Sequence, residues 1–285
     1  MNLAVKFCFD GVCDLGYKQG CDNYKHLNTL YSKFRGLEYS EGCDSNSFWE
    51  QKPNSRFKEI LEKSALYASN FEQMNDIDEF RYTFFYACSI NADQKKKIFE
   101  QIQNFRCLKN KFYITSFSRY CKCEKDYLMW ANYANKSLGV RIDFTISKEN
   151  NKFVMPVQYC DDFPVIEIEN INDSDLKKVM TTKNICWGYE RESRAIFNNE
   201  NFEEHYFPIQ IESITLGRGF CQENSIYDEF DETNIKFDKH AIIVAKFIYE
   251  VLKNTQKYSS KTPKIRAFKT KYSPEPMEIE NSLFN

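Results

Sequence analysis

Two glutamates at alternate positions, with arginines close by, mark the stretch of the chain whose residue types best suit chemistry. The segment CWGYERESRAIF covers residues 186–197 and contains Glu190, Glu192 and Arg194. We predict a strand over 184–197, because alternate side chains of a strand share a face. The two carboxylates would then start about 6 to 7 Å apart along the backbone. The opposite face would carry Trp187, Tyr189, Arg191 and Ser193.

A pair of carboxylates in a pocket suits cleavage of a glycosidic bond. One carboxylate can stabilise the positive charge that develops on the sugar, while the other handles a proton. NAD contains such a bond between nicotinamide and ribose. The alternative interpretation of Glu190 and Glu192 is the solvated face of an amphipathic strand, with Arg194 as a surface partner of small energetic weight.

A second group of polar and aromatic side chains lies upstream. We predict a strand over 111–118, a helix over 126–139 and a strand over 140–144. Aromatic rings beside hydroxyl groups are what a nucleotide or ribose pocket uses, although the same rings could simply form core. The candidates are Ser116, Ser118, Trp130, Tyr133 and Arg141.

Composition predicts a globular protein of the cytoplasm. The 39 Lys and Arg nearly balance the 41 Asp and Glu, so no global field favours nucleic acid or an anionic membrane. No apolar run approaches the ~20 residues of a membrane span, and we expect neither a secretion signal nor a membrane partner. The 11 cysteines are scattered and fit a reducing compartment. Structural zinc is disfavoured, because Cys121 and Cys123 lack the usual C-x-x-C spacing.

Short strands and short helices in mixed order predict an α+β fold with a split, mostly antiparallel mixed sheet and flanking short helices. We expect a single domain over 1–285, with 1–55 as an irregular N-terminal extension and 273–285 as a tail. The remaining predictions are a loop over 42–55, helices over 56–64, 93–105, 172–182 and 238–254, a turn around Asn75 and Asp76, and strands over 65–69, 152–159, 164–168, 207–217, 264–272 and 276–280.

Four ordered segments of the chain resemble an uncharacterised bacterial family, domain of unknown function 2971. The family carries the patterns "lyfs…fNDPfE", "SFS…lMWaHYAd.hkGv.ieF", "K…W.YE.E.R" and "I..I.lG". The corresponding segments here are LYASNFEQMNDIDEF, SFSRYCKCEKDYLMWANYANKSLGVRIDF, KNICWGYERESRAIF and IESITLG, which together extend from Leu66 to Gly217.

Two positions depart from that family pattern. Ile77 replaces the proline after Asn-Asp, which changes the rigidity of the turn. Asn132 replaces the histidine of the "MWaHYA" pattern and so removes an imidazole that could act as acid or base.

The family pattern is similar, more remotely, to the ADP-ribosyltransferase fold, particularly to DNA- and RNA-modifying toxins of the DarT kind. The resemblance implies that NAD is a substrate and that Glu190 and Glu192 are the catalytic pair. Glu192 would contact ribose and stabilise the oxocarbenium, and Glu190 would orient the acceptor. Arg35 would anchor the dinucleotide. The pocket wall would be formed by Tyr67 and Ser69, or by Ser116 and Ser118.

Three functions stay open at this stage. The first is an NAD-dependent ADP-ribosyltransferase, an intracellular toxin or phage-defence effector that modifies a protein or nucleic-acid acceptor. The second is an NAD glycohydrolase or nucleoside hydrolase. The third is a non-enzymatic ligand-sensing or protein-interaction module. Arg35, Arg141 and Arg194 compete for the phosphate of the ligand, since spacing does not choose among them.

Overall fold

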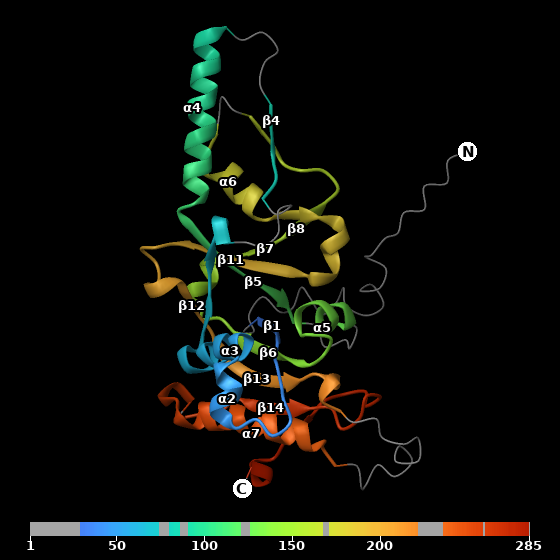
Figure 1. Cartoon of the computed structure of the whole chain (residues 1–285). Helices are drawn as coiled ribbons and strands as arrows, with labels where there is room; N and C mark the ends of the chain where they lie inside the picture. Colours follow the sequence, from blue (N-terminus) through green and yellow to red (C-terminus); the bar gives the residue numbers. More distant parts are fainter. Residues whose placement is uncertain are drawn as a thin grey trace, which may run out of the picture.

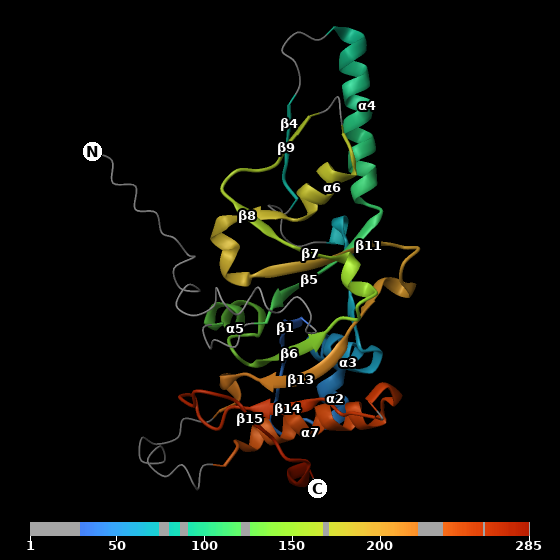
Figure 2. The same ribbon diagram turned by 180° about the vertical axis from the view of Figure 1, so that it is seen from behind.

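A nine-stranded sheet runs through the molecule and connects its two ends (Figures 1 and 2). Its order is β15-β14-β13-β6-β1-β5-β11-β7, with β3 beside β5, and only β13 and β14 pair in parallel. The computed structural model describes residues 29–73, 80–85, 91–120, 126–167, 171–221, 236–258 and 260–284. The strands are β1 (Leu30–Gly36), β3 (Ser69–Asn70), β5 (Phe112–Arg119), β6 (Gly139–Thr145), β7 (Val154–Pro156), β11 (Glu192–Asn198), β13 (Gln210–Leu216), β14 (Lys264–Ala267) and β15 (Met277–Glu278).

The sheet opens at its centre. Strand β1 pairs with β6 along its whole length, from Leu30 to Gly36. With β5 it pairs only at Tyr31 and Ser32, so the two strands diverge beyond that point. The α+β class and the largely antiparallel mixed sheet are therefore confirmed, and the divergence gives the sheet a gap that side chains can line.

One face of the sheet carries the main core. Three helices cover this face: α2 (Ser45–Glu50), α3 (Lys52–Lys63) and α7 (Lys239–Asn254). Apolar side chains of α7 recur at helical spacing, and Val244, Ile248 and Val251 are buried against the sheet. Burial of this stripe holds α7 on the sheet, since transfer of apolar area from water is the dominant stabilising term.

The opposite face carries two smaller cores. The helix α5 (Tyr127–Tyr133) covers one of them, built on Phe34 and Met129. The other core gathers α6 (Asp173–Met180) and the end of α4 (Ala92–Lys109) over the outward residues of β5 and β11. Three short pairs complete the fold: β4 (Thr83–Phe85) with β9 (Val165–Glu167), β10 (Thr182–Asn184) with β8 (Gln158–Cys160), and β12 (Tyr206–Pro208) with β2 (Ala65–Tyr67).

Several predicted boundaries are wrong for local reasons. The segment 42–55 is helical rather than a loop, because the Asp44 carboxylate caps α2 by accepting from the Ser47 backbone N–H at 2.7 Å. Helix α4 is capped two residues before the predicted start at residue 93. Its N-cap is Asn91, which forms a reciprocal capping box with Gln94, and Asp93 lies in the first turn.

The ends of the described chain take part in the sheet. Within the segment expected to be an irregular extension, residues 30–36 form β1 at the centre of the sheet. Within the expected tail, β15 forms an edge strand, and Ile279 and Phe284 are buried in the main core. The predictions for Asn75, Asp76, Ile77, Cys121 and Cys123 lie outside the described residues.

No helix in the described ranges combines the length and the apolar character needed to span a membrane. The same ranges contain no cluster of three or more His, Cys, Asp or Glu side chains placed to hold a metal ion.

Candidate functional site

A polar pocket of about 340 Å³ occupies the gap where β1 and β5 diverge, and we call it the split-sheet pocket. Serine hydroxyls from three strands line it, namely Ser32, Ser69, Ser116 and Ser118. The other wall carries Glu190, Glu192, Tyr133 and Lys183. The pocket therefore brings together hydroxyl donors and two carboxylates.

Strand register places three of these side chains in one row. Ser32 of β1 lies opposite Ser118 of β5, and Ser118 lies opposite Glu192 of β11. Paired residues of neighbouring strands present their side chains to the same face, so Glu192 and the two hydroxyls face the same side of the sheet. The position of Glu192 is thus fixed by the sheet rather than by a loop.

The predicted strand over 184–197 is wrong in its first half. Residues Ile185–Glu190 form the 3-10 helix η6, and Arg191 adopts a left-handed conformation with φ 47° before β11 begins at Glu192. Asn184 caps η6 through the Cys186 N–H, which starts a helical turn where strand alternation was expected. Glu190 and Glu192 still meet, but through a turn and not through strand alternation.

Lys183 of β10 holds the two carboxylates together. Its Nζ lies 2.6 Å from Glu190 Oε2 and 3.4 Å from Glu192 Oε2. All three side chains are almost completely buried. An ammonium between two carboxylates removes the repulsion that would otherwise oppose their burial.

Arg194 fixes the orientation of Glu192. The guanidinium is fully buried, and its Nε and Nη2 lie 2.7 Å and 3.2 Å from the two oxygens of Glu192. Nη1 donates to the Met180 carbonyl at 2.8 Å. Burial acts to raise the pKa of Glu192, but the charge and hydrogen bonds of Arg194, with help from Lys183, outweigh it and lower that pKa to about 2.

The pKa of Glu190 is shifted in the opposite direction to that of Glu192. Burial raises the pKa of its carboxyl, although Lys183 and the Tyr133 hydroxyl, which donates to Glu190 Oε1, both act to lower it. Burial also raises the pKa of Tyr133, and the hydrogen bond to Glu190 adds to that effect. The pocket therefore pairs a carboxylate that stays ionised with one that takes up a proton more easily.

The predicted site residues divide into those that line the split-sheet pocket and those that do not. Ser69, Ser116, Ser118, Tyr133, Glu190 and Glu192 do. Arg194 does not bind at the surface of the pocket, because its three nitrogens are used on Glu192 and on the backbone. Its predicted contact with a cofactor is replaced by the positioning of Glu192.

Arg35 and Tyr67 are not among the residues that line this pocket. Burial lowers the pKa of Arg35, and the neighbouring charge of Arg56 on α3 adds to that effect. Tyr67 is exposed on β2 and packs its ring against Tyr206, 5.5 Å between centroids. Neither residue lines the split-sheet pocket, and the anchor role of Arg35 and the wall role of Tyr67 stay predictions.

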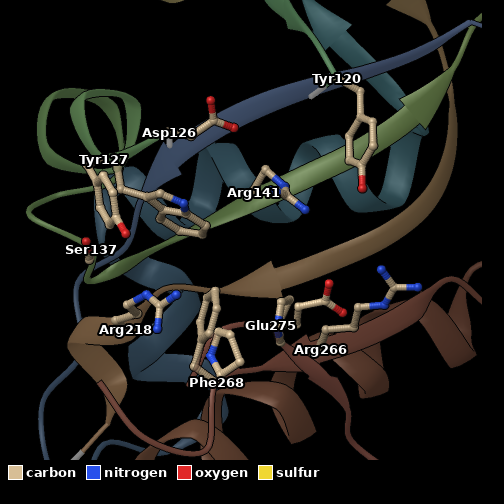
Figure 3. Close-up of a pocket in the computed structure, with 12 residues that line it drawn as sticks. Tyr120, Asp126, Tyr127, Ser137, Arg141, Arg218, Arg266, Phe268 and Glu275 are labelled. Carbon is tan, nitrogen blue, oxygen red and sulfur yellow. The ribbon is translucent and has the colours of Figure 1, made fainter. Parts of the chain in front are cut away.

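Trp130 and Arg141 line a second cavity, which we call the arginine cavity (Figure 3). Helix α5 separates the two: its Met129 and Tyr133 line the split-sheet pocket, and its Tyr127 and Trp130 line the arginine cavity. Asn132, which replaces the family histidine, donates from Nδ2 to the Tyr189 hydroxyl at 3.1 Å.

The sequence-based prediction missed Lys183 and Lys33. Lys183 is the first residue of the segment KNICWGYERESRAIF, so its place beside the glutamates in the chain was the available signal. Lys33 lines the split-sheet pocket, and its Nζ reaches across the gap from β1 to the Ser116 carbonyl of β5. That contact depends on the divergence of two strands and has no local signal.

Comparison of the chain with protein-family models, with curated proteins and with solved structures finds no match in any of the three.

Proposed function

We propose that this protein transfers ADP-ribose from NAD to a macromolecular acceptor, as an intracellular toxin or phage-defence effector. One observation carries the proposal: two buried carboxylates with opposite pKa shifts, Glu190 and Glu192, share one wall of a hydroxyl-lined pocket. The resemblance to DarT-like enzymes adds the choice of NAD.

Glu192 is the residue suited to the charge that develops on the ribose. Cleavage of the N-glycosidic bond leaves the electron pair on nicotinamide and positive charge on the sugar. A carboxylate with a pKa of about 2 is ionised throughout the physiological range and can face that charge. Arg194 and the sheet hold it in one orientation, which avoids reorganisation during the reaction.

Glu190 is the residue suited to proton transfer. The acceptor nucleophile loses a proton as it bonds to the ribose carbon, and a base with a raised pKa accepts that proton more readily. Burial raises the pKa of Glu190 in this direction. Lys183 and Tyr133 contact both of its oxygens and fix its position.

The size and lining of the pocket suit the nicotinamide riboside half of NAD. About 340 Å³ falls in the range of small-molecule sites, which start near ~300 Å³. The hydroxyls of Ser32, Ser116 and Ser118 supply donors and acceptors for the ribose hydroxyl groups.

Water is the simplest alternative acceptor and would make the protein an NAD glycohydrolase. The same carboxylates serve both reactions, so the products decide between them. Free ADP-ribose indicates hydrolysis, and a modified protein or nucleic acid indicates transfer.

A structural role is the second candidate, and charge balance favours it. Lys183 and Arg194 together compensate the charges of Glu190 and Glu192. In this alternative the buried ion network has a purely structural role, and the protein is a non-enzymatic binding module. This candidate predicts that no bond in NAD is broken.

The decisive variant is Glu190→Gln. Glutamine keeps the shape of the side chain and cannot accept the proton, whereas Lys183 keeps Glu192 as a partner. We expect nicotinamide release from NAD to fall about 10²-fold to 10⁴-fold, the range typical of a general base. Nicotinamide is measured by chromatography, with a host lysate present to supply acceptors.

Glu278→Gln is the matched control, because Glu278 forms an exposed ion pair with Lys264 at 2.7 Å and does not line the split-sheet pocket. We expect it to keep wild-type activity. A Glu190→Gln protein that stays folded and releases nicotinamide at the wild-type rate would contradict the proposal, as would a wild-type protein that neither binds nor cleaves NAD.

A further inference from the structure

The arginine cavity lies on the other side of α5 from the split-sheet pocket and has a volume of about 150 Å³. Figure 3 shows Asp126 and Tyr127 on one side of it, Arg218 and Phe268 on the opposite side, and Arg141 between them. It shares no lining residue with the split-sheet pocket. An inference drawn from it therefore does not rest on the function proposed above.

Three guanidinium groups meet in this cavity from segments far apart in the chain. Arg141 comes from β6, Arg218 from the 3-10 helix η8 (Arg218–Phe220) and Arg266 from β14. Strands β6, β13 and β14 are consecutive in the sheet, which brings Arg141 and Arg266 to the same region.

Two of the three are held in place by other contacts. The Arg141 Nε lies 2.9 Å from Asp143 Oδ1. Arg218 Nη1 donates to the carbonyls of Lys271 and Ser273, and its guanidinium lies 3.9 Å from the centre of the Phe268 ring. Arginines fixed in this way lose little conformational entropy when an anion binds.

Arg266 differs from Arg141 and Arg218 in its contacts. In the part of the chain that the structure describes, its side chain forms no ion pair and no hydrogen bond. Two carboxylates line the cavity, and one of them, Asp126, is already paired with Arg191. Only Glu275 lines the cavity without such a partner among the described residues, and Figure 3 shows it beside Arg266.

The charges sum to an excess of one positive charge. Three guanidinium groups that line the cavity, those of Arg141, Arg218 and Arg266, stand against the two lining carboxylates of Asp126 and Glu275. A planar guanidinium matches the geometry of phosphate oxygens through two parallel hydrogen bonds. The electrostatics therefore favour an anion over a neutral ligand.

The aromatic rings indicate what the anion is attached to. Trp130 and Tyr127 line the cavity, and the Tyr127 ring is largely exposed. Nucleic-acid bases stack on such aromatic rings. A cavity of about 150 Å³ is smaller than the ~300 Å³ at which small-molecule sites begin, so it suits the phosphate group and not a whole nucleotide.

We propose that the arginine cavity binds the phosphate group of a nucleotide, with the base lying outside it against Trp130 and Tyr127. The nucleotide is either free or the phosphorylated end of a nucleic-acid strand, since both present the same group.

The test compares AMP with adenosine by isothermal titration calorimetry. We expect AMP to bind at least tenfold more tightly than adenosine, because only AMP carries the phosphate. Arg266→Gln is expected to weaken AMP binding about tenfold to a hundredfold, the range of a lost charge-assisted hydrogen bond. Glu275→Gln is expected to strengthen it, because it removes the carboxylate next to Arg266.

Lys261→Ala is the matched control, since Lys261 forms an exposed ion pair with Glu212 and does not line the cavity. It should leave AMP binding unchanged. Equal binding of AMP and adenosine, or equal AMP binding by the wild-type and a folded Arg266→Gln protein, would overturn the proposal.

A 5′-phosphorylated oligonucleotide and the same strand without phosphate identify the source. If the phosphorylated oligonucleotide binds more tightly than AMP, the ligand is the phosphorylated end of a nucleic acid. If it binds more weakly than AMP, the ligand is the free nucleotide. Failure of both AMP and the phosphorylated strand to bind removes the site, whatever the outcome of the NAD experiment.

Discussion

Arg194 shows how a single buried cation can decide the chemistry of a neighbouring acid. Burial by itself disfavours the ionised form of a carboxyl group. Glu192 is nevertheless stabilised as a carboxylate, because two nitrogens of Arg194 contact its two oxygens. Glu190 has Lys183 and Tyr133 as partners, and its pKa is shifted upward. Two glutamates only two residues apart therefore have opposite pKa shifts, because their partners differ.

The buried ion pair of Glu192 with Arg194 should contribute strongly to stability. Replacing Glu192 with Gln leaves the fully buried Arg194 without its principal counter-charge. Loss of one partner of a buried pair costs about 3–5 kcal/mol, so we expect the free energy of unfolding to fall by that amount. Urea denaturation followed by circular dichroism measures it.

The exposed pair of Lys264 with Glu278 provides the comparison. Glu278→Gln should cost less than about 1 kcal/mol, as for most surface ion pairs. Equal effects of the two substitutions would show that Arg194 is not dependent on Glu192. For the same reason Glu190→Gln, and not Glu192→Gln, is the better test of activity.

At the scale of an element, α5 serves two cavities at once. Met129 and Tyr133 are four residues apart, and Tyr127 and Trp130 are three apart, so each pair shares a face of the helix. One face closes the split-sheet pocket and the other closes the arginine cavity. The short helix is therefore the wall between them.

Helix α4 is the opposite case, an element held mainly at one end. Figures 1 and 2 show it extending away from the sheet, and Phe105 and Lys109 are its buried residues. Phe105 is 1% exposed and lies among Tyr82 and Phe84, whereas Phe99 is 62% exposed. The contact with the body is thus near its C-terminal end.

Alanine substitutions along α4 should separate these two regions. Phe105→Ala is expected to lower the free energy of unfolding by about 3–5 kcal/mol, through lost burial and the cavity left behind. Phe99→Ala should change it by less than about 0.5 kcal/mol, as for an exposed position. Thermal and urea unfolding of the two variants check this, and similar losses would mean that the outer half of α4 is also packed.

At the scale of the whole molecule, a row of buried polar side chains crosses the sheet. Ser213, Asp143, Ser32, Ser118 and Glu192 occupy successive strands at paired positions. Ser32 and Ser213 both donate to Asp143, at 2.6 Å and 3.2 Å. Arg141 joins the same carboxylate, so the row connects the arginine cavity with the split-sheet pocket.

The two glutamates should make global stability depend on pH in two separate windows. The pKa of Glu192 is lowered from 4.5 to about 2 in the folded state, so its contribution is complete above about pH 4.5 and is lost as the pH falls toward 2. The loss amounts to about 3 kcal/mol. The pKa of Glu190 is raised, so its contribution is complete below pH 4.5 and is lost as the pH rises through its folded pKa.

Urea unfolding at pH 7, 4.5 and 3 tests this in wild type and in each glutamine variant. Relative to wild type, Glu192→Gln should flatten the decline between about pH 4.5 and 3, and Glu190→Gln should flatten the change above about pH 4.5. Identical pH profiles for all three proteins would contradict the assignment of the shifts.

Local patterns determined much of what lies within single elements. The strand over β5, with its alternating serines, and the apolar stripe of α7 were predictable, because period and burial are properties of a few neighbouring residues. The Glu190 and Glu192 pair was also found from local spacing, although the strand assumed for it is a helical turn followed by a strand.

Only the tertiary structure decided which of these residues meet. Lys183 lies between the glutamates because β10 packs beside η6, Arg194 turns inward to Glu192, and Arg141, Arg218 and Arg266 converge from three segments. Such contacts depend on strand order and on where two strands diverge, which no local spacing encodes. The sequence therefore determined the chemical groups, and the long-range pairing of the sheet determined their arrangement into two sites.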